Sequence, residues 1–308
     1  MLNAIAIIIS KLPFRLLYLL SDFVYLIVYY VVRYRREVVR KNLLCSFPEK
    51  TEKERKTIEK KFYRWFCDYF LETIKLLDMT PEKMKEHLEW RNVEELEKCY
   101  DKGQHTAIFL GHYCNWEWLT DVNNCFKRHE GVVCGMIYHP LRSDAFDELF
   151  IKIRSHLGSV CIKKKNILRA FVRYKKENKL TLFGYIADQS PKWENIHLWL
   201  DFMHQNTPVF TGAERIATKM NNAAFYCDME RPCRGKYIAT FHKMTDTPGE
   251  LNEFDITKDF FHRLETTIHR QPEFYLWTHN RWKRTMEGYR EWERKKEEKK
   301  NMGKESAE

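Results

Sequence analysis

The chain has 308 residues, of which 44% are hydrophobic and 31% charged, as is typical of a globular protein with a sizeable core. Its nine cysteines form no CxxC pair, so the sequence does not indicate a zinc-ribbon or thioredoxin-like protein. We expect the protein to lie in a reducing compartment. The net charge of +10 favours an anionic partner, such as nucleic acid, an anionic membrane surface or an acidic protein.

The first feature along the chain is an apolar run, Leu16–Val32, that leads directly into the basic cluster Arg33–Arg36. As a helix, this run would be about 25 Å long, which is at the short end for a membrane span. Asp22 lies inside the run, and a charge at the bilayer centre costs about 2.5–3.5 kcal/mol.

We expect this segment to attach the protein to a membrane. A cleaved signal peptide fits poorly, because no A-x-A site follows and the cationic residues come after the apolar run. A single span with the basic cluster on the cytoplasmic side and an interfacial or re-entrant helix both stay open. A buried helix in a soluble core is the plainest alternative, but it explains the basic cluster less well.

A long helix is predicted after the turn at Pro48-Glu49. Thr51 and Glu54 have the spacing of a capping box, which satisfies free backbone N–H groups at a helix start. Apolar residues then recur at helical spacing from Ile58 to Phe70, so we expect one face of this helix to pack on the core.

From Thr106 onwards, apolar strands alternate with amphipathic helices. The sequence predicts strands at 106–111, 131–137, 160–163, 179–188, 223–232 and 236–244, and helices at 116–126, 143–158, 166–178 and 256–272. This alternation is typical of an α/β fold with a mainly parallel mixed sheet flanked by helices. The tail 286–308 is charged all round, and we expect it to be solvated or disordered.

His112 and Glu117, in "GHYCNWEW", are the strongest chemical signal. His112 follows a predicted strand, at the sheet edge where open α/β proteins bind ligands. Two residues five apart on one helix diverge by about 140°, but a helix starting near Asn115 would leave His112 in the preceding turn. The Glu117 carboxylate could then reach Nδ1 of His112, fix its tautomer and make Nε2 a better general base.

Catalysis is not the only role open to this pair. Cys114 is the only nearby nucleophile and lacks a G-x-S-x-G-like elbow, so a base here would activate a hydroxyl on a substrate. One His and one Glu without partners make no metal site. A core histidine beside a glutamate at a helix N-terminus needs no function, and the spacing alone favours this purely structural role.

Motifs in a fixed order shift the balance towards catalysis. "GHYCNWEW" resembles the His, four residues, Asp/Glu signature of the glycerolipid acyltransferase superfamily, and the order of motifs is similar to that of the bacterial lipid A late acyltransferases. After the anchor and the arginines, the matching segments are Asn42-Leu43, Phe47-Pro48, His112 with Glu117, Arg154 with Gly158, Asp188-Gln189, Thr207–Ala217 and Pro272–Lys283. The wider superfamily often has Asp at the position of Glu117, whereas Glu also occurs in the lipid A branch.

The resemblance implies an O-acyltransferase that moves a fatty acyl chain from an acyl carrier protein or acyl-CoA thioester to a hydroxyl of a lipid A precursor. It implies no cofactor and no metal. His112 would be the catalytic base, oriented by Glu117 as the second catalytic residue, and Arg154 and Asp188 would bind substrate. A fork-shaped guanidinium such as that of Arg154 suits a phosphate. We expect the residues of the closing motif, Trp277, His279, Arg281 and Trp282, to pack rather than react.

The expected partners are acyl carrier protein, the lipid A precursor and anionic membrane lipids, met by Lys163–Lys165 and the N-terminal arginines. Nucleic acid is not expected, because no RRM or helix-turn-helix pattern occurs. The expected place is the cytoplasmic face of the bacterial inner membrane, with an anchor and basic segment at 1–41, an acyltransferase domain at 42–285 and a flexible tail at 286–308. Alternatives are acylation of a lysophospholipid or amino-acid lipid, and a non-catalytic basic protein of the membrane surface.

Overall fold

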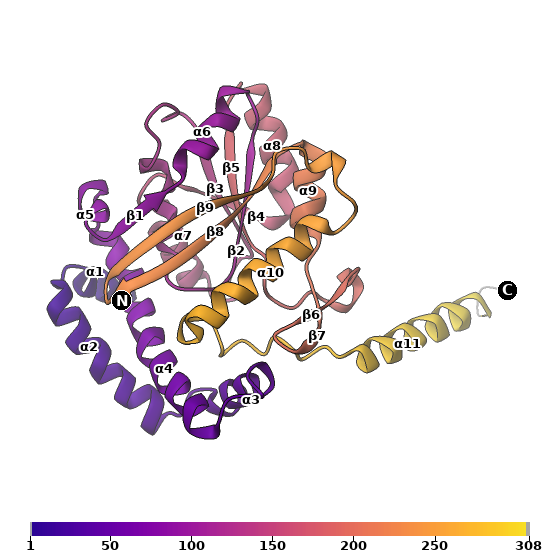
Figure 1. Cartoon of the computed structure of the whole chain (residues 1–308), viewed down its shortest axis with the longest axis horizontal. Helices are drawn as coiled ribbons and strands as arrows, with labels where there is room; N and C mark the ends of the chain where they lie inside the picture. The colour runs from indigo at the N-terminus through magenta and orange to yellow at the C-terminus, as the bar shows by residue number, and fades with distance from the viewer. Residues whose placement is uncertain (1, 306–308) are drawn as a thin grey trace.

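A seven-stranded sheet flanked by helices forms the centre of the computed structural model, which describes residues 2–305 (Figure 1). The strand order is β1-β9-β8-β2-β5-β3-β4. Strands β8, β2, β5, β3 and β4 run parallel to one another, whereas β9 is antiparallel to β8 and β1 runs with β9. The predicted α/β fold with a mainly parallel mixed sheet is therefore confirmed.

The strands fall where continuous apolar runs predicted them, with two exceptions. The sheet contains β1 (Leu88–Arg91), β2 (Thr106–Leu110), β3 (Val133–Tyr138), β4 (Val160–Lys163), β5 (Thr181–Ile186), β8 (Ala223–Cys233) and β9 (Lys236–Thr245). The first of these strands and a separate hairpin of β6 (Trp199–Phe202) and β7 (Gln205–Pro208) were not predicted. Each has only four residues, which is too short for a clear periodicity.

Eleven α-helices are present among the described residues. They are α1 (Leu2–Ser10), α2 (Phe14–Leu26), α3 (Arg36–Ser46), α4 (Glu52–Lys75), α5 (Pro81–Lys85), α6 (Val93–Asp101), α7 (Asp144–Ser155), α8 (Ile167–Lys176), α9 (Gly212–Met220), α10 (Asp255–Arg270) and α11 (Met286–Glu305). The capping box at the start of α4 is confirmed, with the Thr51 N–H donating to the Glu54 carboxylate at 2.7 Å and the Glu54 N–H donating to the Thr51 hydroxyl at 3.3 Å.

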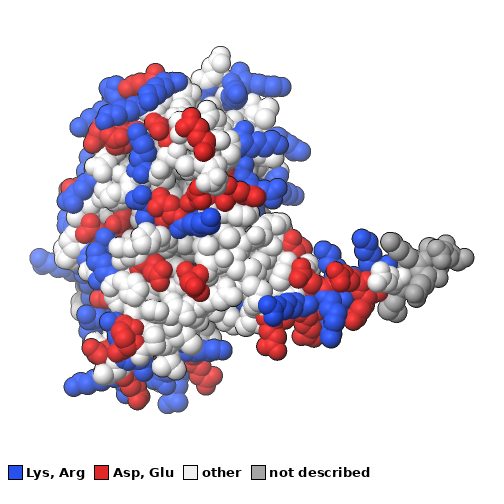
Figure 2. All heavy atoms as spheres, turned by 45° about the vertical axis from the view of Figure 1, so that its right-hand side comes forward, with Lys and Arg blue, Asp and Glu red and all other residues white. Residues whose placement is uncertain are grey.

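One predicted helix was wrong. Segment 116–126 is not an α-helix but contains a 3₁₀ helix, η3, from Trp118 to Asn124. The tail was predicted to be solvated or disordered. It is largely solvent-exposed and helical up to Glu305, forming α11, which extends away from the body with both signs of charge interspersed along it (Figures 1 and 2). Pairs one turn apart, such as Lys295 with Glu291 at 2.6 Å, support a helix without an apolar face. Residues 306–308 of the predicted tail lie outside the described residues.

The N-terminal helices form a layer against α4, at the lower left of Figure 1. Helix α2 and the π-helical turn η1 (Ile27–Val31) bury one stripe of residues against it, with a spacing of four: Leu17, Ser21, Tyr25 and Tyr29. The opposite stripe is apolar and exposed, and includes Leu19, Phe23 and Val31. Phe14–Val31 is long and apolar enough to cross a membrane, but only 22% of it is buried in the protein. The segment formed by α2 and η1, called the anchor below, therefore packs against the protein on one side and exposes an apolar surface on the other.

Candidate active site

His112 and Asp188 meet at the carboxyl ends of two neighbouring parallel strands. In the register of β2 and β5, Leu110 pairs with Ile186. His112 and Asp188 each lie two residues beyond these strand ends, so they lie level with one another. The ladder continues one step further, because the Ala187 N–H donates to the Leu110 carbonyl at 3.2 Å. The sheet edge predicted to carry the site is thus the edge at which these two side chains come together.

The contact between the two side chains is short and sheltered. Nδ1 of His112 lies 2.6 Å from Oδ1 of Asp188, and the exposed fractions of the side chains are 15% and 2%. Burial by itself would raise the pKa of Asp188, but the charge and the hydrogen bond of His112 outweigh it, and the pKa lies below its ordinary value. Asp188 is therefore ionised and fixes the proton of the imidazole on Nδ1, which leaves Nε2 as an acceptor.

Gln189 occupies the acceptor side of the imidazole. Its side-chain Nε2 lies 3.0 Å from Nε2 of His112, so the amide donates to the lone pair that Asp188 leaves free. The next residue, Ser190, accepts a hydrogen bond from Arg284 Nη1 at 3.2 Å. A hydroxyl that gives its proton to His112 has to take the place of the Gln189 amide at Nε2.

The predicted contact between Glu117 and Nδ1 of His112 is wrong. Glu117 instead forms a two-pronged ion pair with Arg154 of α7, at 2.7 Å from Nε to Oε2 and 2.6 Å from Nη2 to Oε1. The Tyr69 hydroxyl donates to the same carboxylate at 3.5 Å. The Glu117 side chain is 2% exposed and that of Arg154 is 19% exposed, so the pair is nearly sealed.

The local backbone explains why Asp188, and not Glu117, contacts His112. Cys114 has a left-handed backbone, with φ at 51°, which turns the chain sharply between His112 and Glu117. The 3₁₀ helix then starts at Trp118, three residues later than the helix start that was expected near Asn115. As a result, His112 faces β5 while Glu117 faces α4 and α7.

An aromatic wall separates the two pairs. The ring of Trp116 lies edge-on to His112, at 5.0 Å between centroids, and also packs against Tyr69 at 4.2 Å. Trp116 is 5% exposed and Trp118 is fully buried, so both pack in the core. Because these rings exclude water, the charges on each side interact more strongly than they would in solvent.

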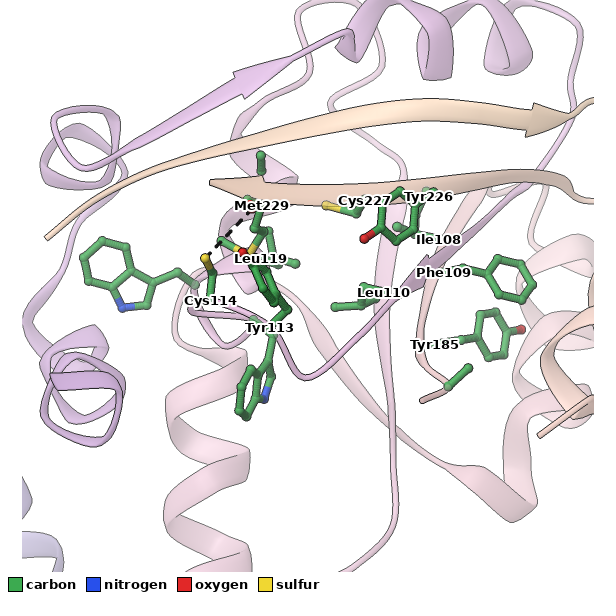
Figure 3. Packing of buried hydrophobic residues seen from close by; sticks show 14 of the residues in the cluster. Ile108, Phe109, Leu110, Tyr113, Cys114, Leu119, Tyr185, Tyr226, Cys227 and Met229 are labelled. Carbon is green, nitrogen blue, oxygen red and sulfur yellow. Dashed lines mark hydrogen bonds between the residues drawn. The ribbon is translucent and has the colours of Figure 1, made fainter. Parts of the chain in front are cut away.

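Cys114 is not a nucleophile in this structure. It is fully buried, and burial raises the pKa of its thiol well above the ordinary value, so the reactive thiolate is absent at neutral pH. Its sulfur lies 3.9 Å from the Met229 carbonyl, among the apolar residues where β2, β5 and β8 meet (Figure 3). Gly111 packs closely against α10, because a Cβ there would come within 2.6 Å of the Leu264 side chain, which would have to shift.

The closing motif clamps the loop that carries His112. Tyr113 and Tyr275 form an isolated β-bridge, and the Leu276 N–H donates to the His112 carbonyl at 3.1 Å. The Asn42 amide in turn donates to the Trp277 and His279 carbonyls at 2.8 and 2.9 Å. Motifs that are far apart in the sequence therefore meet at one loop.

Most of the closing motif packs as predicted, but His279 comes close to the site. Trp277 is fully buried and Arg281 is 1% exposed, with Nη2 of Arg281 donating to the Pro208 carbonyl at 2.7 Å. Burial lowers the pKa of His279 to about 4 despite the opposing effect of Asp188, so this imidazole is neutral at neutral pH. Its proximity to Asp188 could not be read from the sequence.

The structure thus sorts the four predicted site residues into two pairs. His112 meets Asp188, which lies behind the imidazole instead of facing outward as a substrate ligand. Glu117 meets Arg154, which uses Nε and Nη2 for this pair, while its Nη1 has no hydrogen-bond partner among residues 2–305. A role for Arg154 in binding a substrate phosphate stays a prediction.

Comparisons with known proteins agree on one family. A family model described as bacterial lipid A biosynthesis acyltransferase matches residues 1–284. The chain is 18% identical over 239 residues to lipid A biosynthesis acyltransferase 2 of Shigella flexneri, covering 77% of this chain and 74% of that protein. It is also 18% identical over 250 residues to lipid A biosynthesis myristoyltransferase of Escherichia coli (strain K12), covering 77% of this chain and 71% of that protein. The family match ends just before α11.

Proposed function

The chain belongs to the bacterial lipid A biosynthesis acyltransferase family, and from this premise we propose that it transfers a fatty acyl chain from acyl carrier protein to a hydroxyl of a lipid A precursor. The observation that carries this proposal is the His112–Asp188 pair at the ligand-binding edge of the sheet. An acyltransferase of this kind needs a base for a hydroxyl proton, and Nε2 of His112 is an acceptor in a suitable place.

The proposed reaction uses one base and no covalent enzyme intermediate. The acceptor hydroxyl displaces the Gln189 amide and gives its proton to Nε2 of His112 while its oxygen bonds to the thioester carbonyl carbon. The tetrahedral intermediate collapses, the carbon–sulfur bond breaks, and the leaving thiolate takes the proton back from His112. Asp188 stabilises the imidazolium that exists between the two proton transfers.

We assign Glu117 and Arg154 a second task at the same site. The ion pair holds the Arg154 guanidinium in one orientation, with Nη1 free to meet a phosphate of the lipid acceptor. Burial by itself would lower the pKa of Arg154, but Glu117 outweighs it and raises the pKa, so the side chain stays charged. Glu117 then contributes to catalysis by fixing the acceptor beside His112.

Basic residues near the site suit an acidic acyl carrier protein as the donor. Lys163 ends β4, and Lys164 and Lys165 follow it. Because β4 is parallel to β2 through β3 and β5, these lysines lie at the same sheet edge as His112. An acidic carrier protein fits such a patch. We expect transfer from acyl carrier protein to weaken as salt increases and after Lys164→Glu, while transfer from acyl-CoA changes little. Equal salt dependence for both donors would contradict this assignment.

The N-terminal helices support a place on the cytoplasmic face of the inner membrane. The outward stripe of α2 and η1 is apolar, and the exposed Arg33 and Arg35 follow it directly, as suits phospholipid head groups. In this proposal residues 1–41 attach the protein to the membrane, 42–285 carry the acyltransferase domain, and 286–308 form an appendage. Salt washing should not release the full-length protein from membranes, whereas detergent should.

The proposed function is tested by lipid analysis. A strain that lacks the protein should make lipid A with one acyl chain fewer by mass spectrometry. The wild-type gene should restore the missing chain and the gene for His112→Ala should not. Unchanged lipid A in the deletion strain would contradict the proposal, and loss of a chain from another lipid would reassign the acceptor.

A further inference from the structure

A buried carboxylate on α4, Glu72, takes no part in the proposed reaction, yet four separate segments donate hydrogen bonds to it. Its Oε1 accepts from Tyr18 of α2 at 2.9 Å and from Arg231 of β8 at 3.4 Å. Its Oε2 accepts from Tyr237 of β9 at 2.6 Å and from the Asn115 amide at 2.9 Å. Glu72 is fully buried, so these protein groups supply all the hydrogen bonds that water would otherwise make.

The Glu72 contacts join the anchor to the loop that carries His112. Asn115 lies between His112 and Glu117 in the chain and is fully buried. The backbone carbonyl of Glu72 also accepts from Trp118 Nε1 at 3.0 Å, so the same residue holds both Asn115 and the start of η3. On its other side Glu72 holds Tyr18, which belongs to the anchor helix.

A second carboxylate one turn earlier, Asp68, fixes the rest of the anchor's inner face. It accepts from the Ser21 hydroxyl at 2.6 Å and from Arg234 at 2.6 and 3.0 Å. Arg234 also pairs with both oxygens of Asp22, at 2.9 and 3.1 Å. The polar residues that made the apolar run a poor membrane span therefore pair with α4 and the β8–β9 hairpin.

Removing any one member of this cluster would be costly, because each buried charge depends on the others. Burial alone would lower the pKa of Arg231, but Tyr237, Glu72 and Asp68 raise it, so the guanidinium stays charged. A charged group that loses a partner in such a place keeps the cost of its burial without the compensating bond. The contacts of Glu72 to the anchor and to the loop are thus held in one arrangement.

We infer that Glu72 is a positioning residue through which the docked anchor helix sets the place of the loop that carries His112. The inference rests on the proposed function, since it assumes that His112 is the base. The anchor is then a structural part of the active site as well as a membrane attachment. If the anchor served only to attach the protein to the membrane, substitutions on its inner face would lower activity only when they also weakened membrane binding.

The test compares two tyrosines of the anchor in the full-length protein. Tyr18→Phe removes the hydroxyl that Glu72 binds, whereas Tyr30→Phe, the matched control, removes a hydroxyl from a residue that is half exposed. Both variants are assayed in vesicles of anionic phospholipid for vesicle binding, thermal midpoint, kcat and KM. We expect Tyr18→Phe to lower kcat about tenfold to a hundredfold, because a displacement of a catalytic group by about 1 Å can cost about 100-fold in rate, with vesicle binding and KM unchanged. Tyr30→Phe should match the wild type.

A double-variant cycle connects the two ends of the proposed path. If Tyr18 acts through Glu72 and Asn115, then Asn115→Ala should lower kcat, and adding Tyr18→Phe should lower it little further. Equal kcat for Tyr18→Phe and wild type, a fall in kcat that only follows lost vesicle binding, or fully additive effects would each overturn the inference. His112→Ala in the same assay separates the two proposals, because full activity of that variant contradicts the proposed function itself.

Discussion

Two residues only five positions apart, His112 and Glu117, each form a charged pair with a distant residue, and the two pairs differ in how tightly they are held. His112 and Asp188 join through one hydrogen bond, with the imidazole partly exposed and its second nitrogen held only by the Gln189 amide. Glu117 and Arg154 join through two bonds in a nearly sealed setting. The first pair can exchange a proton with a ligand, whereas the second is held by two short bonds and keeps the Arg154 guanidinium charged. The first pair therefore suits a general base, and the second suits a rigid binding group.

The first way to break this comparison is to remove the proposed base. His112→Ala should lower kcat by about 10²–10⁴-fold, because this is the usual contribution of general base catalysis. Its thermal midpoint should fall by less than that of Glu117→Ala, because Asp188 can bind a proton once His112 is gone, as its burial favours. Transfer of radiolabel from acyl carrier protein to lipid A precursor measures the effect. Wild-type kcat in the folded variant would remove His112 from the mechanism.

The second pair should matter more to folding than the first. Glu117→Ala leaves the buried part of Arg154 without its partner, and such a loss costs about 3–5 kcal/mol of the free energy of unfolding. Urea unfolding in detergent micelles measures this. His112→Ala serves as the comparison and should be less destabilised, because Asp188 can become neutral by binding a proton whereas Arg154 cannot lose its charge. Equal stability of the two variants would show that the pairs do not differ in this way.

Asp188→Asn should lower kcat less than His112→Ala, because it leaves the base in place but removes the group that fixes its tautomer. It should also change the response to acid. The pKa of Asp188 is lowered in the fold, so its contribution to stability is complete above the unfolded value of about 3.9 and is lost as the pH falls through the folded value. Unfolding free energies measured from pH 6 to pH 3 should therefore fall less steeply for the variant. An unchanged slope would contradict the assigned charge of Asp188.

The smallest expected effect is that of Tyr69→Phe. The Tyr69 hydroxyl is 3.5 Å from Glu117, which is a long hydrogen bond, while two short bonds from Arg154 remain. We expect a loss of no more than about 1 kcal/mol in unfolding free energy and a kcat close to the wild type. A loss as large as that of Glu117→Ala would mean that Tyr69, and not Arg154, is the main support of the carboxylate.

The sequence predicts the sheet and its site edge well because both rest on local patterns. The apolar runs of β2 and β5 are distinct, and each ends two residues before a site residue, His112 or Asp188. The partners of these residues were not predictable from spacing. The left-handed backbone at Cys114 and the 3₁₀ helix after Glu117 depend on tertiary packing, and they reverse which carboxylate faces His112.

The anchor shows the same division between local and tertiary information. Its apolar run, Asp22 and the arginines after it are plain in the sequence. The partners of Ser21 and Asp22 are Asp68 and Arg234, which lie far along the chain and become neighbours only when α2 docks. A polar residue inside an apolar run therefore indicates a docking face here, which hydropathy alone does not distinguish from a poor span.

The most direct test of which carboxylate serves the base is nitrogen NMR of His112 in the full-length protein in detergent micelles. In the neutral imidazole we predict the proton on Nδ1 and none on Nε2, a tautomer that changes in Asp188→Asn and persists in Glu117→Gln. A proton on Nε2 in the wild type, or a tautomer that responds to Glu117→Gln and not to Asp188→Asn, would contradict the assignment of Asp188 as the partner of the base.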